Sequence, residues 1–139
     1  MIAPPPFFDT NILLYSISSI AAEASKRERA LALLDGDDGA LSVQVLQEFY
    51  TQATRGTRPD RLSHQIAAAF ISKWTRFRVQ DVTLAIFDSA LQIKSAHGFS
   101  YWDSAIIAAA CALGCPTLYS EDMRHGAKVE GVSIVNPFL

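Results

Sequence analysis

The stretch from Ser100 to Leu113 is the most restrictive segment of this sequence. After Asp103 it reads Ser-Ala-Ile-Ile-Ala-Ala-Ala-Cys-Ala-Leu, a helix-forming run that is apolar on almost every side. Such a helix has to be deeply buried, with other elements packed around it. Asp103 is its only charge. It precedes Ile106 and Ile107 by about one helical turn, so it lies on the face that points into the protein.

A carboxylate in such a place needs an explanation. Burying it is costly unless it is paired, hydrogen-bonded or bound to a cation. One explanation is a capping box, in which Ser100 caps the helix and Asp103 reaches back to its N–H. The other is a functional acid. We favour function, because so apolar a helix has little use for an acid otherwise.

Short strands and helices alternate along the rest of the chain. The strand-like segments are 7–8, 40–41, 78–82, 117–120 and 132–135, and the helical segments are 11–16, 26–35, 42–53, 60–74, 84–96 and 100–113. Repeated alternation of this kind predicts an α/β fold, a three-layer arrangement in which helices flank a short parallel sheet. At 139 residues, the chain is expected to form a single domain, 1–139.

Composition limits the partners and the compartment. The net charge of −2 gives no global positive field, so a polyanion must be held by local cations or by bound metal. No run is long enough to span a membrane. Cys111 and Cys115 do not form a CxxC pair, and we interpret both as small buried hydrophobic residues. Free thiols are typical of a reducing compartment, which predicts a cytoplasmic protein.

Polar residues follow the first strand directly, in the sequence Phe7-Phe8-Asp9-Thr10-Asn11. In an open parallel sheet, the carboxyl ends of the strands form the edge where ligands bind. Asp9 could instead cap the next helix, as such residues often do. The two roles are compatible if Thr10 or Asn11 serves the helix while Asp9 faces a metal.

Two further segments bring acids toward the same edge. The strand that ends at Tyr119 is followed by Ser120-Glu121-Asp122. The same residues could instead form a solvent-exposed acidic loop. Glu48 lies beside the apolar stripe of the helix that follows the second strand. Taken alone, it is an ordinary glutamate at the boundary of that stripe.

Together, the four acids Asp9, Glu48, Asp103 and Asp122 suggest more than any one of them does. Oxygen ligands without Cys or His partners suit Mg²⁺ or Mn²⁺. Carboxylates that converge without a metal repel one another, so at least one pKa should be raised. The chemistry typical of such a site is metal-assisted hydrolysis of a phosphodiester.

The motifs resemble those of the PIN-domain ribonucleases, and among them the VapC toxins of bacterial toxin–antitoxin pairs. The similarity extends over nearly the whole chain. It is carried by Asp9-Thr10-Asn11 after a strand, Glu48 in Ser-x-x-x-x-x-Glu, Tyr101-Trp102-Asp103-Ser104-Ala105, and Leu118-Tyr119-Ser120-Glu121-Asp122.

The resemblance implies a PIN-like fold and a Mg²⁺- or Mn²⁺-dependent endoribonuclease that cleaves RNA. It also implies a homodimer held inactive by a cognate antitoxin. Carried over residue by residue, it makes catalytic metal ligands of Asp9, Glu48, Asp103 and Asp122. Thr10, Asn11 and Ser120 would orient carboxylates or contact phosphate, and Glu121 is a less certain addition.

RNA contact needs cations, and Arg55 and Arg58 are candidates. The commoner explanation of such arginines is that they lie on a solvated surface. Two other functions compete with the ribonuclease interpretation. A receiver domain fits the alternation of strands and helices, but it wants an acidic pair after the first strand and an Asp at the end of a mid-chain strand. A non-catalytic PIN-like module that binds RNA or protein would more simply have lost one of the four acids.

Overall fold

The protein, described by a computed structural model over residues 3–139, is built on a six-stranded sheet. The strands are β1 (Phe7–Phe8), β2 (Ala40–Ser42), β3 (Arg78–Gln80), β4 (Thr117–Tyr119), β5 (Lys128–Val129) and β6 (Val132–Val135). Their order across the sheet is β3-β2-β1-β4-β6-β5. All neighbouring pairs are parallel except β5 and β6. The prediction of an α/β fold with a short parallel sheet between helices is confirmed. The short strand β5, which was not foreseen, adds one antiparallel pairing at the edge of the sheet.

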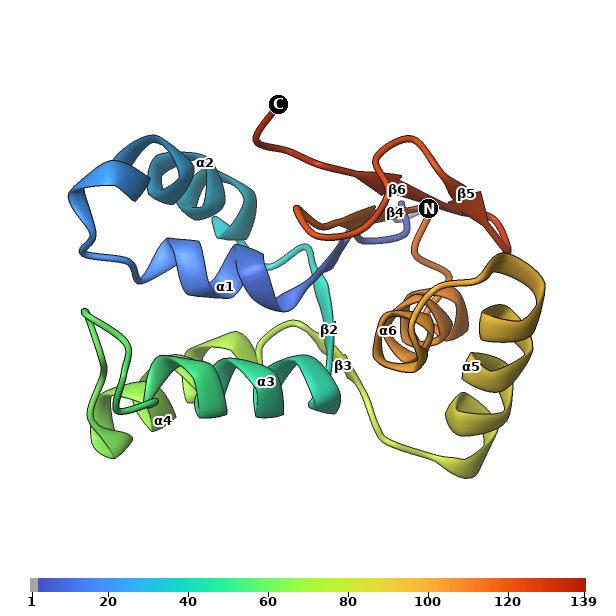
Figure 1. Ribbon diagram of the computed structural model, residues 1–139, viewed down its shortest axis with the longest axis horizontal. Helices are drawn as coiled ribbons and strands as arrows, with labels where there is room; N and C mark the ends of the chain where they lie inside the picture. Colours follow the sequence, from blue (N-terminus) through green and yellow to red (C-terminus); the bar gives the residue numbers. More distant parts are fainter. Residues whose placement is uncertain (1–2) are drawn as a thin grey trace.

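Helices cover the sheet from both sides (Figure 1). They are α1 (Thr10–Ser16), α2 (Ala24–Leu34), α3 (Val43–Ala53), α4 (His64–Trp74), α5 (Leu84–His97) and α6 (Tyr101–Ala112), with a short 3₁₀ turn, η1 (Ala21–Glu23), before α2. The first four helices lie together on one side, and α5 and α6 pack against each other on the other. Within residues 3–139, none of the helices is long and apolar enough to cross a membrane.

Hydroxyl side chains set where several helices begin. Ser42, Ser63, Thr83 and Ser100 each accept a hydrogen bond from the backbone N–H three residues later, which satisfies a donor that the helix leaves unpaired. The cap at Ser63 corrects the predicted start of α4 at Asp60. Asp60 lies in the preceding loop instead, where it accepts from the backbone N–H of Ser19 at 3.0 Å.

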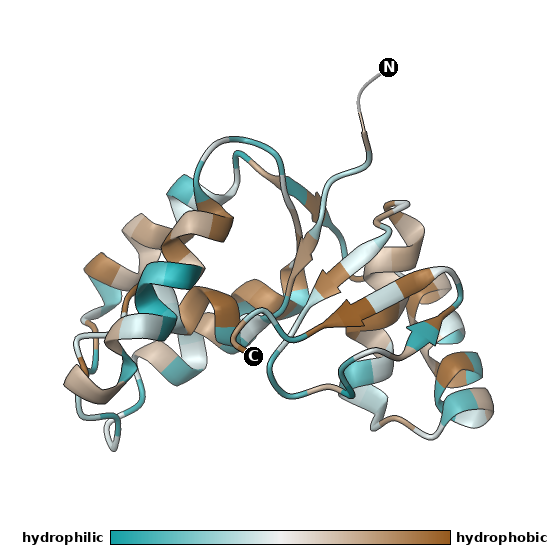
Figure 2. Ribbon diagram, turned by 90° about the horizontal axis from the view of Figure 1, so that it is seen from above, coloured by the Kyte–Doolittle hydropathy of each residue, from teal (hydrophilic) through white to brown (hydrophobic). Residues whose placement is uncertain are grey.

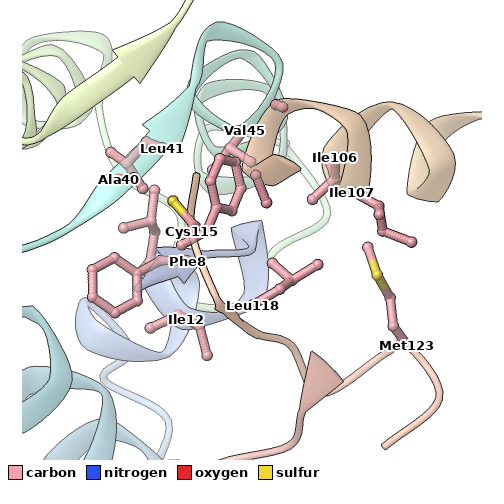
Figure 3. Packing of buried hydrophobic residues seen from close by; sticks show 14 of the residues in the cluster. Phe8, Ile12, Ala40, Leu41, Val45, Ile106, Ile107, Cys115, Leu118 and Met123 are labelled. Carbon is pink, nitrogen blue, oxygen red and sulfur yellow. The ribbon is translucent and has the colours of Figure 1, made fainter. Parts of the chain in front are cut away.

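The core lies between the sheet and the helices. The side chains drawn in Figure 3, among them Phe8, Leu41 and Leu118 from the central strands and Ile107 of α6, belong to one buried cluster. Coloured by hydropathy, the central strands are largely brown and the outward faces of the helices carry more teal (Figure 2). Residues 104–110 of α6 are all buried, as its apolar sequence predicted.

The two cysteines differ from the expectation that both are buried. Cys115 is buried just before β4, whereas Cys111 is exposed near the end of α6. The helix emerges from the core in its last turn, so its apolar character there does not reflect burial. Neither thiol forms a disulfide.

Candidate active site

The site begins where β1 meets β4. The order of the strands reverses at β1, because β2 and β3 are added on one side of it and β4 and β6 on the other. Phe8 pairs with Tyr119 in this register, so Asp9 and Ser120 leave their strands side by side. The backbone N–H of Asp9 donates to the Tyr119 carbonyl at 3.0 Å. This is the topological switch point at which open α/β sheets bind ligands.

Asp9 is 4% exposed, and both of its carboxylate oxygens accept hydrogen bonds. Oδ1 accepts from the backbone N–H of Thr10 at 2.7 Å, and Oδ2 accepts from the Ser120 hydroxyl at 2.7 Å and the Asn11 amide at 3.3 Å. Asp9 is therefore itself the N-cap of α1. The expectation that Thr10 or Asn11 would cap the helix in its place is wrong, because one oxygen of the Asp9 carboxylate forms the cap.

Glu48 is brought to the same place by α3. The Thr10 hydroxyl donates to Glu48 Oε1 at 2.6 Å, and the Gln44 side chain donates to Oε2 at 3.0 Å. Gln44 also donates to the Trp102 carbonyl, one residue before Asp103, at 3.1 Å. It thus links the first turns of α3 and α6, and it holds Glu48 at the boundary between them.

Asn11 connects Asp122 to the site. Its side-chain amide donates to Asp122 Oδ2 at 3.2 Å as well as to Asp9, and its carbonyl oxygen accepts from the Glu121 backbone N–H at 3.1 Å. The Ser120 hydroxyl accepts from the backbone N–H of Asp122 at 3.2 Å. Thr10, Asn11 and Ser120 therefore all contact the predicted acids directly, which fits the carboxylate-orienting role expected of them.

Asp103 lies in the first turn of α6. The Ser100 hydroxyl accepts from its backbone N–H at 3.1 Å, which is one half of the capping box considered above. The reciprocal bond, from the Ser100 N–H to the Asp103 carboxylate, is absent from the hydrogen bonds of this fully described turn. The local explanation leaves the carboxylate only partly satisfied, and Asp103 is half-buried beside the other acids.

The charges of the four acids act on one another. Burial raises the pKa of Asp9 to about 7, against hydrogen bonds from Ser120 and Thr10 that lower it, and the charges of Glu48 and Asp103 raise it further. Burial also raises the pKa of Asp103, together with the charges of Asp122 and Glu48. Four carboxylates from four parts of the chain thus share one electrostatic environment.

The donor set fits a hard divalent cation. Asp9, Glu48, Asp103 and Asp122 take part in none of the ion pairs formed among residues 3–139. In the same residues, no three Asp, Glu, His or Cys side chains are arranged as a ready-made metal site. Hydrogen bonds from Thr10 and Gln44 hold Glu48, and three donors hold Asp9, so some of these bonds must give way for carboxylates to converge. Oxygen-only donors with no cationic partner match the preferences of Mg²⁺ and Mn²⁺.

The two arginines considered for RNA contact differ in position. Arg58 lines a hollow together with Asn11 and Asp122, whereas Arg55 does not. Nε of Arg58 lies 2.8 Å from Oδ1 of Asp60, but the two atoms are not aligned for a hydrogen bond. Arg58 is thus held by its charge contact with Asp60 at one edge of this hollow, next to the acid cluster.

Sequence reasoning missed Gln44, Lys26 and Tyr15. Gln44 precedes Glu48 by one turn of α3, and this i, i+4 spacing is a signal that could have identified it. Lys26 forms an ion pair with Glu121 at 2.6 Å, and Tyr15 hydrogen-bonds the same carboxylate. No local pattern marks these two residues, because their partner is about a hundred positions away.

The fold and the site define an α/β protein with a cluster of acids at the switch point of its sheet. The family model of the PIN domain matches residues 7–129. The chain belongs to the PIN-domain family, and the resemblance inferred from its motifs is confirmed. Among curated proteins, no sequence matches this chain significantly.

Solved structures of toxin–antitoxin proteins share the fold. A toxin–antitoxin complex from Klebsiella pneumoniae is 19% identical, with a TM-score of 0.69 over 95% of this chain and 97% of that one. VapC20 of Mycobacterium tuberculosis, a toxin that cleaves the sarcin–ricin loop, is 23% identical, with a TM-score of 0.65 over 84% and 89%. VapBC2 of Rickettsia felis, bound to a DNA fragment from its promoter, is 15% identical, with a TM-score of 0.61 over 93% and 96%. At these identities the likeness establishes the common fold.

The raised pKa of Asp9 predicts how stability depends on pH in metal-free buffer. Between the ordinary value of 3.8 and about 7, the folded state holds the Asp9 proton more tightly than the unfolded state does. The contribution of Asp9 to the free energy of unfolding should therefore fall as pH rises from 4 to 7.5. Asp9→Asn removes this contribution. Its altered hydrogen bonds also change the free energy of unfolding, but by an amount that does not depend on pH.

Urea unfolding of the wild type and Asp9→Asn at several pH values, with EDTA present, measures this. The stability of the variant relative to the wild type should rise by at least about 1 kcal/mol between pH 5 and 7.5. Asp88→Asn, which changes an exposed carboxylate on α5, should follow the wild type. Parallel profiles for Asp9→Asn and the wild type would show that Asp9 is ionised as easily as an exposed acid.

Proposed function

We propose that the protein is a metal-dependent endoribonuclease that hydrolyses RNA phosphodiester bonds at the four-acid site. The observation that carries this proposal is the buried Asp9 at the switch point of a PIN fold, close to three more carboxylates that, like Asp9, form no ion pair within residues 3–139. Asp9, Glu48, Asp103 and Asp122 would hold Mg²⁺ or Mn²⁺. A buried acid with a raised pKa in a ligand-binding edge is the pattern expected of a functional group.

Each part of the site has a task in this proposal. Bound metal supplies Lewis acidity for the attack of water on the phosphodiester and offsets the charge of the phosphate. Ser120 and the backbone N–H of Thr10 hold Asp9 in one orientation, and Gln44 and the Thr10 hydroxyl hold Glu48. Asn11 keeps Asp122 near Asp9. Such supporting bonds keep ligands close to the geometry that metal binding needs.

The biological role that we propose is that of the toxin of a type II toxin–antitoxin pair. It rests on the family and on structural neighbours that are themselves toxins or toxin–antitoxin complexes. A cognate antitoxin is then the expected protein partner, and RNA in the cytoplasm is the substrate.

A homodimer is part of the same proposal, and one exposed apolar surface supports it. Leu84, Phe87 and Leu91 lie on one face of α5 and are 44–74% exposed. Val82 and Trp102 are 67% and 63% exposed, and they line a hollow with Phe87. We call these five residues the α5 patch. Large exposed apolar patches mark surfaces that associate with other proteins.

For the nuclease activity, Asp103→Asn is the decisive substitution. It keeps the size of the side chain and the N–H that Ser100 caps, but it removes a charge that a divalent cation needs. With Mg²⁺ or Mn²⁺, the wild type should cleave total RNA, and Asp103→Asn should be slower by at least about 100-fold. EDTA should stop the wild type, and induced expression should arrest growth only with the wild-type protein.

Asp88→Asn serves as the matched control, because it removes an exposed carboxylate of α5 that is not one of the four acids, and it should cleave normally. A Mn²⁺ titration separates this proposal from the non-catalytic module. Intact RNA in every reaction, together with no Mn²⁺ binding or binding indifferent to Asp9→Asn, would favour the module.

RNA binding should distinguish Arg58 from Arg55. Measured in the Asp103→Asn background, where RNA is not cleaved, Arg58→Ala should weaken binding and flatten the plot of log affinity against log salt by about one unit. Arg55→Ala should change neither, since Arg55 lies outside the hollow beside Asp122. Arg58→Lys retains the charge and should recover the slope.

Melting temperatures of these variants show whether the loss of the Arg58 side chain also destabilises the loop that carries Arg58 and Asp60. An unchanged salt slope for a folded Arg58→Ala would remove Arg58 from the RNA site. An equal effect of Arg55→Ala would show that the cations act as a diffuse field rather than through this hollow.

The α5 patch makes the oligomeric state testable. Sedimentation velocity of the wild type should show a dimer, and Leu84→Lys should weaken it at least about tenfold by placing an unpaired charge in the interface. Ile66→Lys on α4 also adds a lysine at an exposed apolar position, 51% exposed, and should leave the dimer intact. A monomeric wild type, or a dimer indifferent to Leu84→Lys, would contradict this assignment.

A further inference from the structure

Glu121 stands next to Asp122 in the chain, yet its carboxylate is fully engaged elsewhere. Lys26 of α2 donates to Oε2 at 2.6 Å, and the Tyr15 hydroxyl of α1 donates to Oε1. Lys26 also lies 3.3 Å from the Tyr15 oxygen. Three residues from three separate segments therefore form a closed set of contacts, which we call the Lys26 clamp (Lys26, Tyr15 and Glu121).

The clamp has a well-defined environment at the surface. The Lys26 ammonium lies 5.0 Å from the centre of the Tyr15 ring and 5.9 Å from that of Phe138. The two rings meet edge to face with their centres 5.0 Å apart. Burial alone would raise the pKa of Glu121, but hydrogen bonds from Lys26 and Tyr15 outweigh it and lower that pKa below its ordinary value. Glu121 is thus a fixed, ionised anchor.

What the clamp fixes is the loop that carries Asp122. The Glu121 backbone N–H donates to the Asn11 side chain at 3.1 Å, and the same side chain donates to Asp122 at 3.2 Å and to Asp9 at 3.3 Å. Asp122 is exposed, and Asn11 is the one side chain that hydrogen-bonds its carboxylate within the described chain. Its position depends on the backbone before it, which Glu121 anchors.

We propose that Lys26 and Tyr15 are positioning residues for the metal site, because they hold Glu121 and thereby place Asp122 and Asn11 beside Asp9. This inference rests on the proposed function, since it assumes that Asp122 binds metal. The clamp also keeps a fifth carboxylate paired with a cation and away from the cluster of four. Residues that orient metal ligands in this way typically contribute 10- to 100-fold to metal affinity.

Charge and positioning predict opposite results for Lys26→Met, which makes the test sharp. By charge alone, loss of a cation near an acidic metal site should tighten Mn²⁺ binding. If Lys26 positions Asp122, the same change should weaken it. Tyr15→Phe removes one hydrogen bond without any change of charge, so it isolates positioning from electrostatics.

The experiment is Mn²⁺ binding followed by calorimetry and by the EPR signal of the free ion, with the full chain and no RNA. Lys26→Met should weaken binding by about tenfold and Tyr15→Phe by a smaller factor. Lys26→Arg keeps the pairing with Glu121 and should stay near the wild type. Arg29→Met is the matched control: Arg29 is also on α2 and contacts the Pro137 carbonyl at 3.3 Å, so it should bind normally.

Melting temperatures without metal show whether any variant has lost its fold, and Tyr15→Phe and Lys26→Arg remain informative if Lys26→Met has. Wild-type protein that binds no Mn²⁺ would overturn the proposed metal site and this inference with it. If the wild type binds and Asp9→Asn does not, but Lys26→Met and Tyr15→Phe bind as tightly as the wild type or more tightly, the metal site stands. The positioning role is then wrong.

Discussion

The pairing of β1 with β4 is the constraint on which the site depends. It joins residues 111 positions apart, so that the Ser120 hydroxyl meets the Asp9 carboxylate at 2.7 Å in a buried environment. Parallel strands cannot be joined by a tight turn, and the long connection between these two contains the helices α1 to α6 in succession. The rest of the fold therefore serves to close this one contact, and the acids from α3 and α6 arrive beside it as a consequence.

Asp9 combines a structural role with the chemical role that we propose for it. One oxygen caps α1, and the other accepts from Ser120 and Asn11. Capping does not remove the electrostatic cost of burial, because the pKa of Asp9 is still raised to about 7. A residue kept only as a cap would be served as well by Ser or Asn, which carry no charge to bury. The retained carboxylate is what a cation-binding site needs.

The sequence was a good guide wherever a residue's position follows from its own strand or helix. Asp9 and Ser120 could be placed because each directly follows a short apolar strand, and Asp103 because α6 is too apolar to carry an idle charge. The two-residue strand β5 has too little pattern to be recognised, and the start of α4 was misplaced because Asp60 resembles a cap as much as Ser63 does. Glu48 was placed through the resemblance, since its partner Thr10 lies 38 residues away. The Lys26 clamp could not be foreseen, because nothing local links α2 to the loop after β4.

The pairing of charges separates the acids around this edge into two groups. Glu121 has a lysine at 2.6 Å and a lowered pKa, so its charge is already balanced. Asp9 and Asp103 have raised pKa values, and neither they nor Glu48 and Asp122 form an ion pair among the described residues. The fold thus neutralises Glu121 with Lys26 but leaves these four acids without an ion pair, and burial makes this costly for Asp9 and Asp103. In the proposed metal site a divalent cation would offset that cost, and this asymmetry supports four ligands rather than five.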